Sequence, residues 1–429
     1  MSAEDGTWRD APSYPRPPET SQRGKPDEDL AAGPRATAVI CGIGTETEAE
    51  SLDALQSLIS GPLAGLSAEI DGDRPLGIGL RLSARALETA ADPGQREGLR
   101  RLLGEARTVP VSANGFAPGP LLPGRVKERV FLPDWLAEER LHYTTALGEL
   151  MAEIAPIGHV VSVTTAPGAD RALGKHEATL ADIADGLLRA AAHFSELERR
   201  TGRRAIIAVQ PVPGGVLETA EEAAAFFERW LFGPTATRRF AALSDLPPSR
   251  AAEALPAHIG VCLDTAAMAV MDEDASGALN ALRRVGVSVA KVLIGAAIRF
   301  DPTDTEARYA LARMELDRHR HPVVGSLPDG TSVRFEDLAA ALEDVPTTQA
   351  RGIWRVYRKV PLAGDALDPS GALVRLTEPA ETILALHRKA PVAREIEIES
   401  VVPPRDPGYI KAMRADMAWV QARVGSTSR

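Results

Sequence analysis

The stretches RAIIAVQPVPG (204–214) and HIGVCLDT (258–265) decide the fold. Each contains a run of aliphatic residues as long as a buried strand, and each run ends in a polar residue. Between them, residues 219–231 have the apolar spacing of a helix. A strand, a helix and a second strand in this order predict two parallel strands joined by a right-handed crossover.

The same alternation continues along the chain from Ala36. Nine apolar runs begin at Thr37, Leu76, Thr108, Gly158, Arg204, His258, Val287, Gly352 and Arg394. Helical spacing marks 48–59, 84–106, 135–154, 179–200, 219–231 and 275–285. Eight strand–helix units close a TIM (β/α)8 barrel, so we predict an α/β barrel and expect the surplus strand near residues 352–359.

The remaining segments define the predicted domains. Residues 1–35 are rich in Pro, Gly and charged residues, which predicts a disordered tail. The barrel is expected over 36–405, and 406–429 should form a helix, from Ile410 to Val424, that packs on it. Two long loop insertions are expected: 115–133, and 299–349 with a helix and a turn at PDGTSVRF.

The composition restricts the class of protein. The chain has 429 residues, a formal net charge of −10 and no dense basic cluster, which argues against a nucleic-acid partner. It has no apolar stretch long enough to insert into a membrane and no signal peptide at its start. Its two cysteines, Cys41 and Cys262, lie in apolar runs and predict buried free thiols in a reducing cytoplasm.

Polar residues at strand ends are the candidates for chemistry in such a barrel. Asp264 is either a ligand or base at the barrel mouth or the N-cap of the next helix. Gln210 and Asn114 are able to hydrogen-bond a substrate. Arg81 is either a carboxylate clamp or part of a salt bridge inside the barrel, and Lys291 is either functional or an ion-paired structural lysine.

The last run carries Glu395, Glu397 and Glu399 at a period of two, so all three side chains point to one face. Three buried, ionised carboxylates need cations nearby. The candidates for these cations are Lys291, Arg355, Lys359 and a metal. The alternative is an edge strand with a solvated acidic face.

Motifs of other enzyme classes are missing: the sequence has no HExxH, GxSxG, Walker phosphate loop or paired CxxC. RHRHP (318–322) follows Asp317 and places His319 and His321 close together, but arginines alternate with them. This cluster is either a metal site or a solvated basic turn, and the arginines favour the turn.

Several segments resemble the EboE family of metabolite traffic proteins, which belongs to the xylose isomerase-like TIM barrels. They are GIGLRLS (77–83), SANGF (112–116), VKERVFLPDW (126–135), ERLHYTTAL (139–147), PGGVLET (213–219), VCLDT (261–265), WRVYRKVPL (354–362) and EIEIES (395–400). The resemblance covers about residues 36–424, and VKERVFLPDW followed by ERLHYTTAL is its most specific part. It implies a barrel related to sugar-phosphate isomerases and epimerases, with a role in moving or processing a metabolite precursor.

The chain departs from the pattern of that superfamily at its metal ligands. Gln210 stands where relatives have Glu, Ala267 where they have His, and Tyr357-Arg358-Lys359 where they have His-x-His. Glu397 and Glu399 are kept. Asp264 and Glu399 remain as candidate ligands of a weakly bound divalent metal, so no tightly bound cofactor is expected. We hypothesise that the Lys359 ammonium replaces the missing cation and pairs with a terminal glutamate.

Three functions remain open. The first is an EboE-like barrel that binds a small polar metabolite in precursor handling or transport. The second is a sugar-phosphate isomerase or epimerase, with Glu397 or Glu399 as the base and Lys291 or Lys359 as the stabiliser of an enolate. The third is a scaffold that docks other proteins of the same gene cluster. The expected substrate contacts are Arg81, Asn114, Gln210, Asp264, Arg355, Tyr357 and Lys359.

Overall fold

A computed structural model describes residues 38–42, 51–70, 75–116, 130–314, 320–348, 352–399 and 401–424. These residues belong to one compact unit that spans 36–429. The predicted N-terminal tail, Asp317 and His319 lie outside the described residues.

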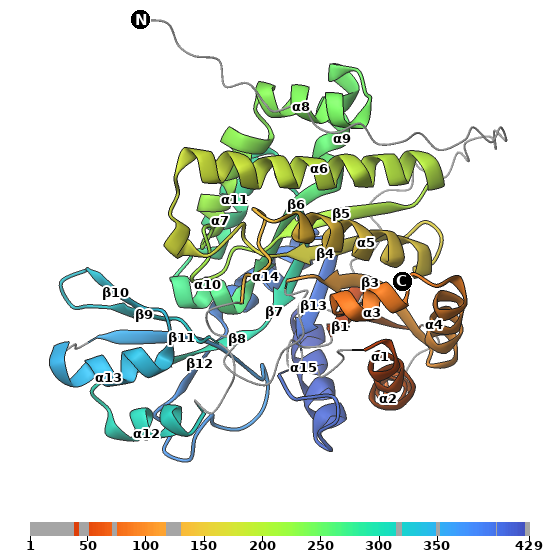
Figure 1. The fold of residues 1–429 in the computed structure, drawn as a ribbon. Helices are drawn as coiled ribbons and strands as arrows, with labels where there is room; N and C mark the ends of the chain where they lie inside the picture. The colour runs from red at the N-terminus through yellow and green to blue at the C-terminus, as the bar shows by residue number, and fades with distance from the viewer. Residues whose placement is uncertain are drawn as a thin grey trace, which may run out of the picture. The chain divides into compact units, whose positions relative to one another are not determined.

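Eight parallel strands close a barrel in the order β1-β13-β7-β6-β5-β4-β3-β2 (Figure 1). Their bounds are β1 Ala38–Gly42, β2 Leu76–Leu80, β3 Thr108–Asn114, β4 Val160–Thr165, β5 Arg204–Val209, β6 Ile259–Asp264, β7 Val289–Ile294 and β13 Glu395–Glu399. Every neighbouring pair is parallel, including β1 with β2 and β1 with β13, which completes the circle. The predicted TIM barrel is therefore confirmed.

Helices follow the strands and cover the outside of the barrel. They are α1 Leu52–Leu58, α2 Ala64–Glu69, α3 Ala84–Thr89, α4 Pro93–Glu105, α5 Glu138–Ile154, α6 Glu177–Thr201, α7 Ala220–Phe226, α8 Pro234–Ser244, α9 Pro248–His258, α10 Thr265–Met271, α11 Ala275–Val285, α14 Glu378–Lys389 and α15 Tyr409–Val424. The single helix expected over 84–106 is two helices, because Pro93 starts α4 and Asp92 caps it by accepting a hydrogen bond from the Gln95 amide. Helix α15 packs on α14 and α2.

Strand faces alternate between the helices and the barrel interior. On β5, Ile207 and Val209 pack outward in the main hydrophobic core, whereas Ile206 and Ala208 belong to a separate small cluster inside the barrel with Cys262. All of these side chains are buried. The polar residues described below continue this inward-facing set toward the strand ends.

A second sheet is inserted between β7 and α14, with the order β10-β9-β11-β8-β12 and antiparallel pairing (Figure 1). Its elements are β8 Ala296–Phe300, α12 Thr305–Met314, β9 Val323–Ser326, β10 Ser332–Phe335, α13 Leu338–Thr348, β11 Ile353–Val360 and β12 Val374–Leu376. The surplus strand predicted near 352–359 is β11, and it lies in this sheet. The helix and the turn expected over 299–349 are present as α12 and the connection between β9 and β10, and the segment also contains strands that were not predicted.

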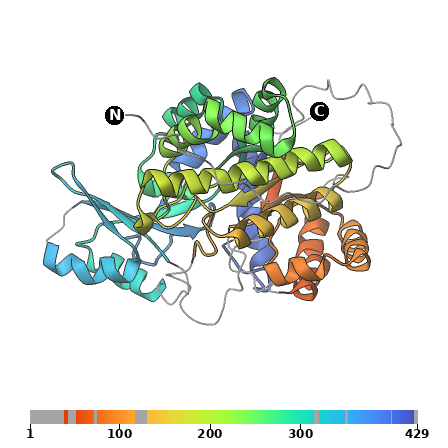
Figure 2. The same ribbon diagram turned by 45° about the horizontal axis from the view of Figure 1, so that its top comes forward.

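The second sheet packs against the barrel through α10, which contacts β8 and β11. In both views it lies to one side of the barrel, away from α1 and α2 (Figure 1 and Figure 2). This contact brings β11 next to the C-terminal end of β6, where α10 begins. None of the helices within the described ranges has the length and apolar character needed to cross a bilayer.

Candidate active site at the barrel mouth

The three glutamates of β13 point into the barrel. The Ser162 hydroxyl on β4, the strand opposite β13 in the circle, donates a hydrogen bond to Glu395. The Ser112 hydroxyl on β3 donates to Glu397. All three glutamates are buried. Because β13 lies between β1 and β7, it is not an edge strand, and the reading of a solvated acidic face is wrong.

Lys291 and Glu397 form an ion pair in the centre of the barrel. Their Nζ and Oε2 atoms are 2.9 Å apart, and the side chains are 0% and 2% exposed. Burial alone would lower the pKa of Lys291, but Glu397, Cys262 and Glu395 raise it above its ordinary value. A Cβ atom at Gly79 would lie 2.7 Å from the Glu397 carboxyl group, so only glycine leaves room for this pair.

Glu395 lies one layer deeper, next to Lys291 on the neighbouring strand. Burial raises the pKa of its carboxyl group to about 8, although the Ser162 hydroxyl and Lys291 act in the opposite direction. Glu395 is therefore mostly protonated at neutral pH. The centre of the barrel then holds a neutral carboxylic acid and one balanced ion pair.

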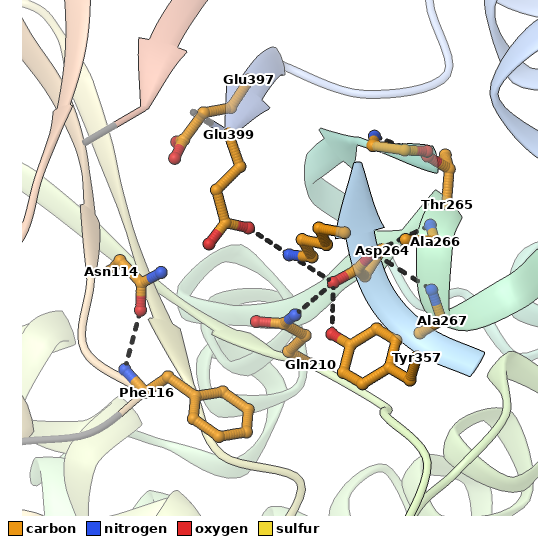
Figure 3. Close-up of polar contacts among 12 residues, drawn as sticks. Asn114, Phe116, Gln210, Asp264, Thr265, Ala266, Ala267, Tyr357, Glu397 and Glu399 are labelled. Atoms are coloured by element: carbon orange, nitrogen blue, oxygen red, sulfur yellow. Dashed lines mark hydrogen bonds and ion pairs between the residues drawn. The ribbon is translucent and has the colours of Figure 1, made fainter. Parts of the chain in front are cut away.

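Asp264 is the centre of the polar cluster at the mouth. Its Oδ1 atom accepts hydrogen bonds from the backbone amides of Ala266 and Ala267, at 3.0 and 3.2 Å, and so caps α10. Its Oδ2 atom accepts from Gln210 Nε2 at 2.9 Å and from the Tyr357 hydroxyl at 2.7 Å (Figure 3). The N-cap reading of Asp264 is therefore confirmed for Oδ1, while Oδ2 belongs to the polar cluster at the mouth.

Lys359 joins Asp264 to Glu399. Its Nζ atom lies 2.9 Å from Asp264 Oδ2 and forms a second ion pair with Glu399. Burial works against the charge on Lys359, but the two carboxylates hold its pKa well above the ordinary value. Burial and the adjacent Asp264 also raise the pKa of Tyr357 well above its ordinary value, so its hydroxyl stays protonated. The side chain of Lys359 is 18% exposed, so solvent reaches the cluster there.

This donor set does not fit a divalent metal. Asp264 Oδ2 already accepts from Gln210, Tyr357 and Lys359, and Oδ1 is used by the helix cap. The ammonium of Lys359 lies between the two carboxylates that remained as candidate ligands. In the part of the chain that the structure describes, no group of three or more His, Cys, Asp or Glu side chains is arranged to hold a metal.

Three hydrogen-bonding atoms of the mouth have no partner among the described residues. Asn114 Oδ1 accepts from the Phe116 amide at 3.1 Å, which fixes the orientation of this side chain and leaves Nδ2 uncommitted. The bond from Gln210 to Asp264 in the same way leaves the Gln210 oxygen uncommitted. Glu399 uses one carboxylate oxygen for Lys359 and keeps the other. In Figure 3 the three atoms face the space between them.

An apolar cluster adjoins these polar groups. The Tyr357 ring packs against a cluster that contains Phe131, Val212 and Ala267, and Phe116 packs on the same cluster. The Phe116 and Phe131 ring centroids are 5.8 Å apart. The mouth therefore combines hydrogen-bonding atoms with aromatic surface.

Arg140 on α5 fixes the backbone directly after β3 and shortly before α5. Its side chain is fully buried and donates hydrogen bonds to the carbonyls of Gly115, Phe116 and Pro133, at 2.7, 2.9 and 2.7 Å. Burial lowers the pKa of Arg140 to about 10, so it remains a cation at neutral pH. It holds the backbone that carries Phe116 and follows Asn114.

No protein-family model matches this sequence, and no curated protein is similar to it. Solved structures with a similar architecture include a xylose isomerase domain protein from Alicyclobacillus acidocaldarius subsp. acidocaldarius, with 14% identity, a TM-score of 0.39 and coverage of 90% of this chain and 99% of that one. The IOLI protein with a bound zinc atom has 12% identity, a TM-score of 0.40 and coverage of 91% and 100%. D-psicose 3-epimerase, solved in the presence of D-fructose, has 12% identity, a TM-score of 0.40 and coverage of 90% and 100%. At these identities the similarity concerns the fold alone.

Some predicted site residues lie elsewhere. Arg355 is on β11 like Lys359, but it pairs with Asp272 at 2.8 Å and with the Ser326 hydroxyl at 2.8 Å, at the far end of α10. Arg81, in contrast, directly follows β2 at the mouth end of the barrel, where it is buried and its charge acts on Tyr143. Lys291 and Glu397 lie below the mouth, where the ion pair occupies both.

His321 also lies outside the barrel mouth. Its ring hydrogen-bonds the Tyr357 carbonyl at 3.1 Å and Arg358 at 3.0 Å, so it supports the backbone of β11.

The strand-end argument missed the residues that support the site. Ser112 and Ser162 carried a usable signal, because both lie at inward positions of predicted strands. Ser112 is two residues before Asn114 on β3, and Ser162 lies beside Ser112 on β4. Phe116 and Arg140 carried none, since each contacts the mouth through a loop whose path the sequence does not predict.

Proposed function

We propose that the barrel mouth binds a small, hydroxyl-bearing polar metabolite. The observation that carries this proposal is the set of uncommitted atoms on Asn114, Gln210 and Glu399, which face one another beside the fixed charge of Lys359. A hydroxyl group donates and accepts at once, so it satisfies both an amide nitrogen and a carboxylate oxygen. None of the three atoms is among the buried unpartnered polar atoms of the described residues, so water reaches them and a ligand hydroxyl would replace that water.

In this proposal Lys359 takes the place of a metal ion as the fixed cation of the site. Its ammonium is held by Asp264 and Glu399, and the third N–H remains for a ligand oxygen. Because the pKa of Lys359 lies well above its ordinary value, the charge persists throughout the physiological pH range. A ligand oxygen then meets a preorganised N–H donor without a cofactor.

We also propose the role that the EboE resemblance implies, the handling or transport of a metabolite precursor. The described parts of the two most specific segments, 130–135 and 139–147, support it. Trp135 Nε1 donates to the Thr165 hydroxyl at 3.1 Å, and the Tyr143 hydroxyl donates to the Leu82 carbonyl at 2.6 Å. Together with Arg140, these residues fasten the loop ends at the mouth of the barrel.

Ligand-observed NMR tests the binding proposal. Saturation-transfer spectra of the wild-type protein with a panel of free monosaccharides and inositols should show at least one bound compound. Asn114→Ala should weaken that compound about fivefold to tenfold, which corresponds to one lost hydrogen bond. Asn280→Ala, at an exposed position of α11, is the matched control and should change nothing. A panel without binding, or equal binding by the Asn114 variant, contradicts the proposal.

An isomerase or epimerase is the second candidate, favoured by the pairing of Glu399 with Lys359. The free Glu399 oxygen would accept a proton from a carbon atom of the substrate, and the ammonium of Lys359 would stabilise the enolate oxygen. Glu397 is less suited to this task, since its side chain is only 2% exposed and Lys291 and Ser112 both hold its Oε2 atom. Exchange of a bound sugar's α-hydrogen for deuterium, lost in Glu399→Gln, would support turnover. Binding without exchange would leave the transport role.

A further inference from the structure

The charges at the mouth are unequal. Within the cluster that Lys359 joins, two carboxylates, Asp264 and Glu399, face one ammonium, which leaves one negative charge in that cluster. Tyr357 adds none, because its hydroxyl is protonated. The pair of Lys291 and Glu397 below is balanced.

Two of the three uncommitted atoms at the mouth are hydrogen-bond acceptors. Glu399 is ion-paired through one carboxylate oxygen, and its other oxygen is a strong hydrogen-bond acceptor that has no donor among the described residues. The uncommitted oxygen of Gln210 adds a second acceptor. An ammonium group on a ligand suits these two oxygens better than any other small group does.

Several groups that would suit a phosphate are already occupied. The N-terminus of α10, which points its amides at the mouth, is capped by the Asp264 carboxylate through Ala266 and Ala267. Three guanidinium groups of the second sheet and the segments that lead into it are paired with carboxylates: Arg355 with Asp272, Arg320 with Asp170 and Arg334 with Glu218. A phosphate at the mouth would therefore meet carboxylates without a free cationic partner in these groups.

We infer that the ligand is a non-phosphorylated polyol that carries an amino group, and that the site discriminates against phosphate esters. The inference rests on the proposed binding function and specifies its substrate class. Glu399 is the residue that determines specificity, through its second oxygen. The aromatic surface of Phe116 and Tyr357 would pack on the C–H face of the ligand.

Three sugars that differ in charge test the inference: glucosamine, glucose and glucose 6-phosphate. The amine of glucosamine is mostly protonated at about pH 6.5. Dissociation constants from NMR titration of the wild-type protein should rise about tenfold from glucosamine to glucose, and about tenfold again to glucose 6-phosphate. Glu399→Gln removes the charge without changing the shape of the side chain, and it should bring the three constants within about threefold. Glu105→Gln, on the exposed face of α4, is the matched control.

The order of affinities in the wild-type protein decides the question even if the Glu399 variant fails to fold. Binding of glucose 6-phosphate as tight as that of glucose would overturn the charge assignment, while the binding function would stand because sugars still bind. Equal binding of glucose and glucosamine would overturn the role of the amine. Failure of all three sugars to bind would overturn the proposed function and this inference with it.

Discussion

Replacing Glu395 by Gln should stabilise the protein, and the gain should grow as the pH rises. Burial raises the pKa of this carboxyl group in the folded protein to about 8, whereas the ordinary value is 4.5. A carboxyl group whose pKa is raised by folding makes the folded state less stable as the pH rises from the unfolded pKa through the folded pKa. The loss begins near pH 4.5 and is complete above about pH 8.

The magnitude follows from the difference between the two pKa values. At 1.36 kcal/mol for each pKa unit, the wild-type protein should lose about 3 kcal/mol between pH 4.5 and pH 7, and about 5 kcal/mol by pH 9. The Gln side chain cannot ionise, and its amide oxygen still accepts the hydrogen bond from Ser162. The free energy of unfolding of Glu395→Gln should therefore exceed that of the wild type by an amount that grows across this range.

Urea unfolding at about pH 5, pH 7 and pH 9 measures this difference. The exposed control Glu105→Gln should follow the wild type at each pH. Parallel pH dependence of the wild type and Glu395→Gln would refute the reasoning, because it would place Glu395 in contact with solvent. The predicted barrel interior would then be wrong at its deepest polar layer.

Three further changes test the remaining parts of the site. Lys291→Met should cost about 3–5 kcal/mol of unfolding free energy, because it leaves Glu397 buried and unpaired. Adding Glu397→Gln to this variant should restore most of the lost stability. A double variant no more stable than Lys291→Met would contradict the ion pair. Gly79→Ala should cost about 1–3 kcal/mol, since its Cβ would collide with the Glu397 carboxyl group; an unchanged urea midpoint would show that the space exists. Arg140→Gln should lower the free energy of unfolding by about 3 kcal/mol and increase proteolysis between β3 and α5, because three backbone carbonyls there lose their donor. An unchanged cleavage rate would show that Arg140 does not hold this part of the chain.

The barrel could be predicted from the sequence because each of its strands is a local apolar run followed by a helical segment. The second sheet could not, because β11 pairs with β8 and β9 rather than with a neighbour in a repeated unit, and β9 and β12 are only 4 and 3 residues long. β10, SVRF, has no buried residue among its four, so its pattern resembles a loop. Pairing over such distances in the chain is a tertiary property.

The candidate site was predictable where it depends on strand ends. Asn114, Gln210, Asp264 and Glu399 meet at one end of the barrel because parallel strands bring their carboxyl ends together. The pairing of Lys359 with a glutamate of β13 was predictable because buried carboxylates need a cation nearby. Arg355 shares a face with Lys359 on β11, but the strand runs along α10, which places the two residues at opposite ends of that helix.

The central claim is that Lys359 provides the cation of this site, and titration of the purified protein with Mn²⁺ tests it most directly. Electron paramagnetic resonance of free Mn²⁺, together with metal analysis of protein purified without chelators, should show no stoichiometric ion and no binding at micromolar affinity. Asp264→Asn should then leave the titration unchanged. A stoichiometric metal bound at micromolar affinity and lost in Asp264→Asn would contradict the account, because Asp264 would then serve a metal and not Lys359.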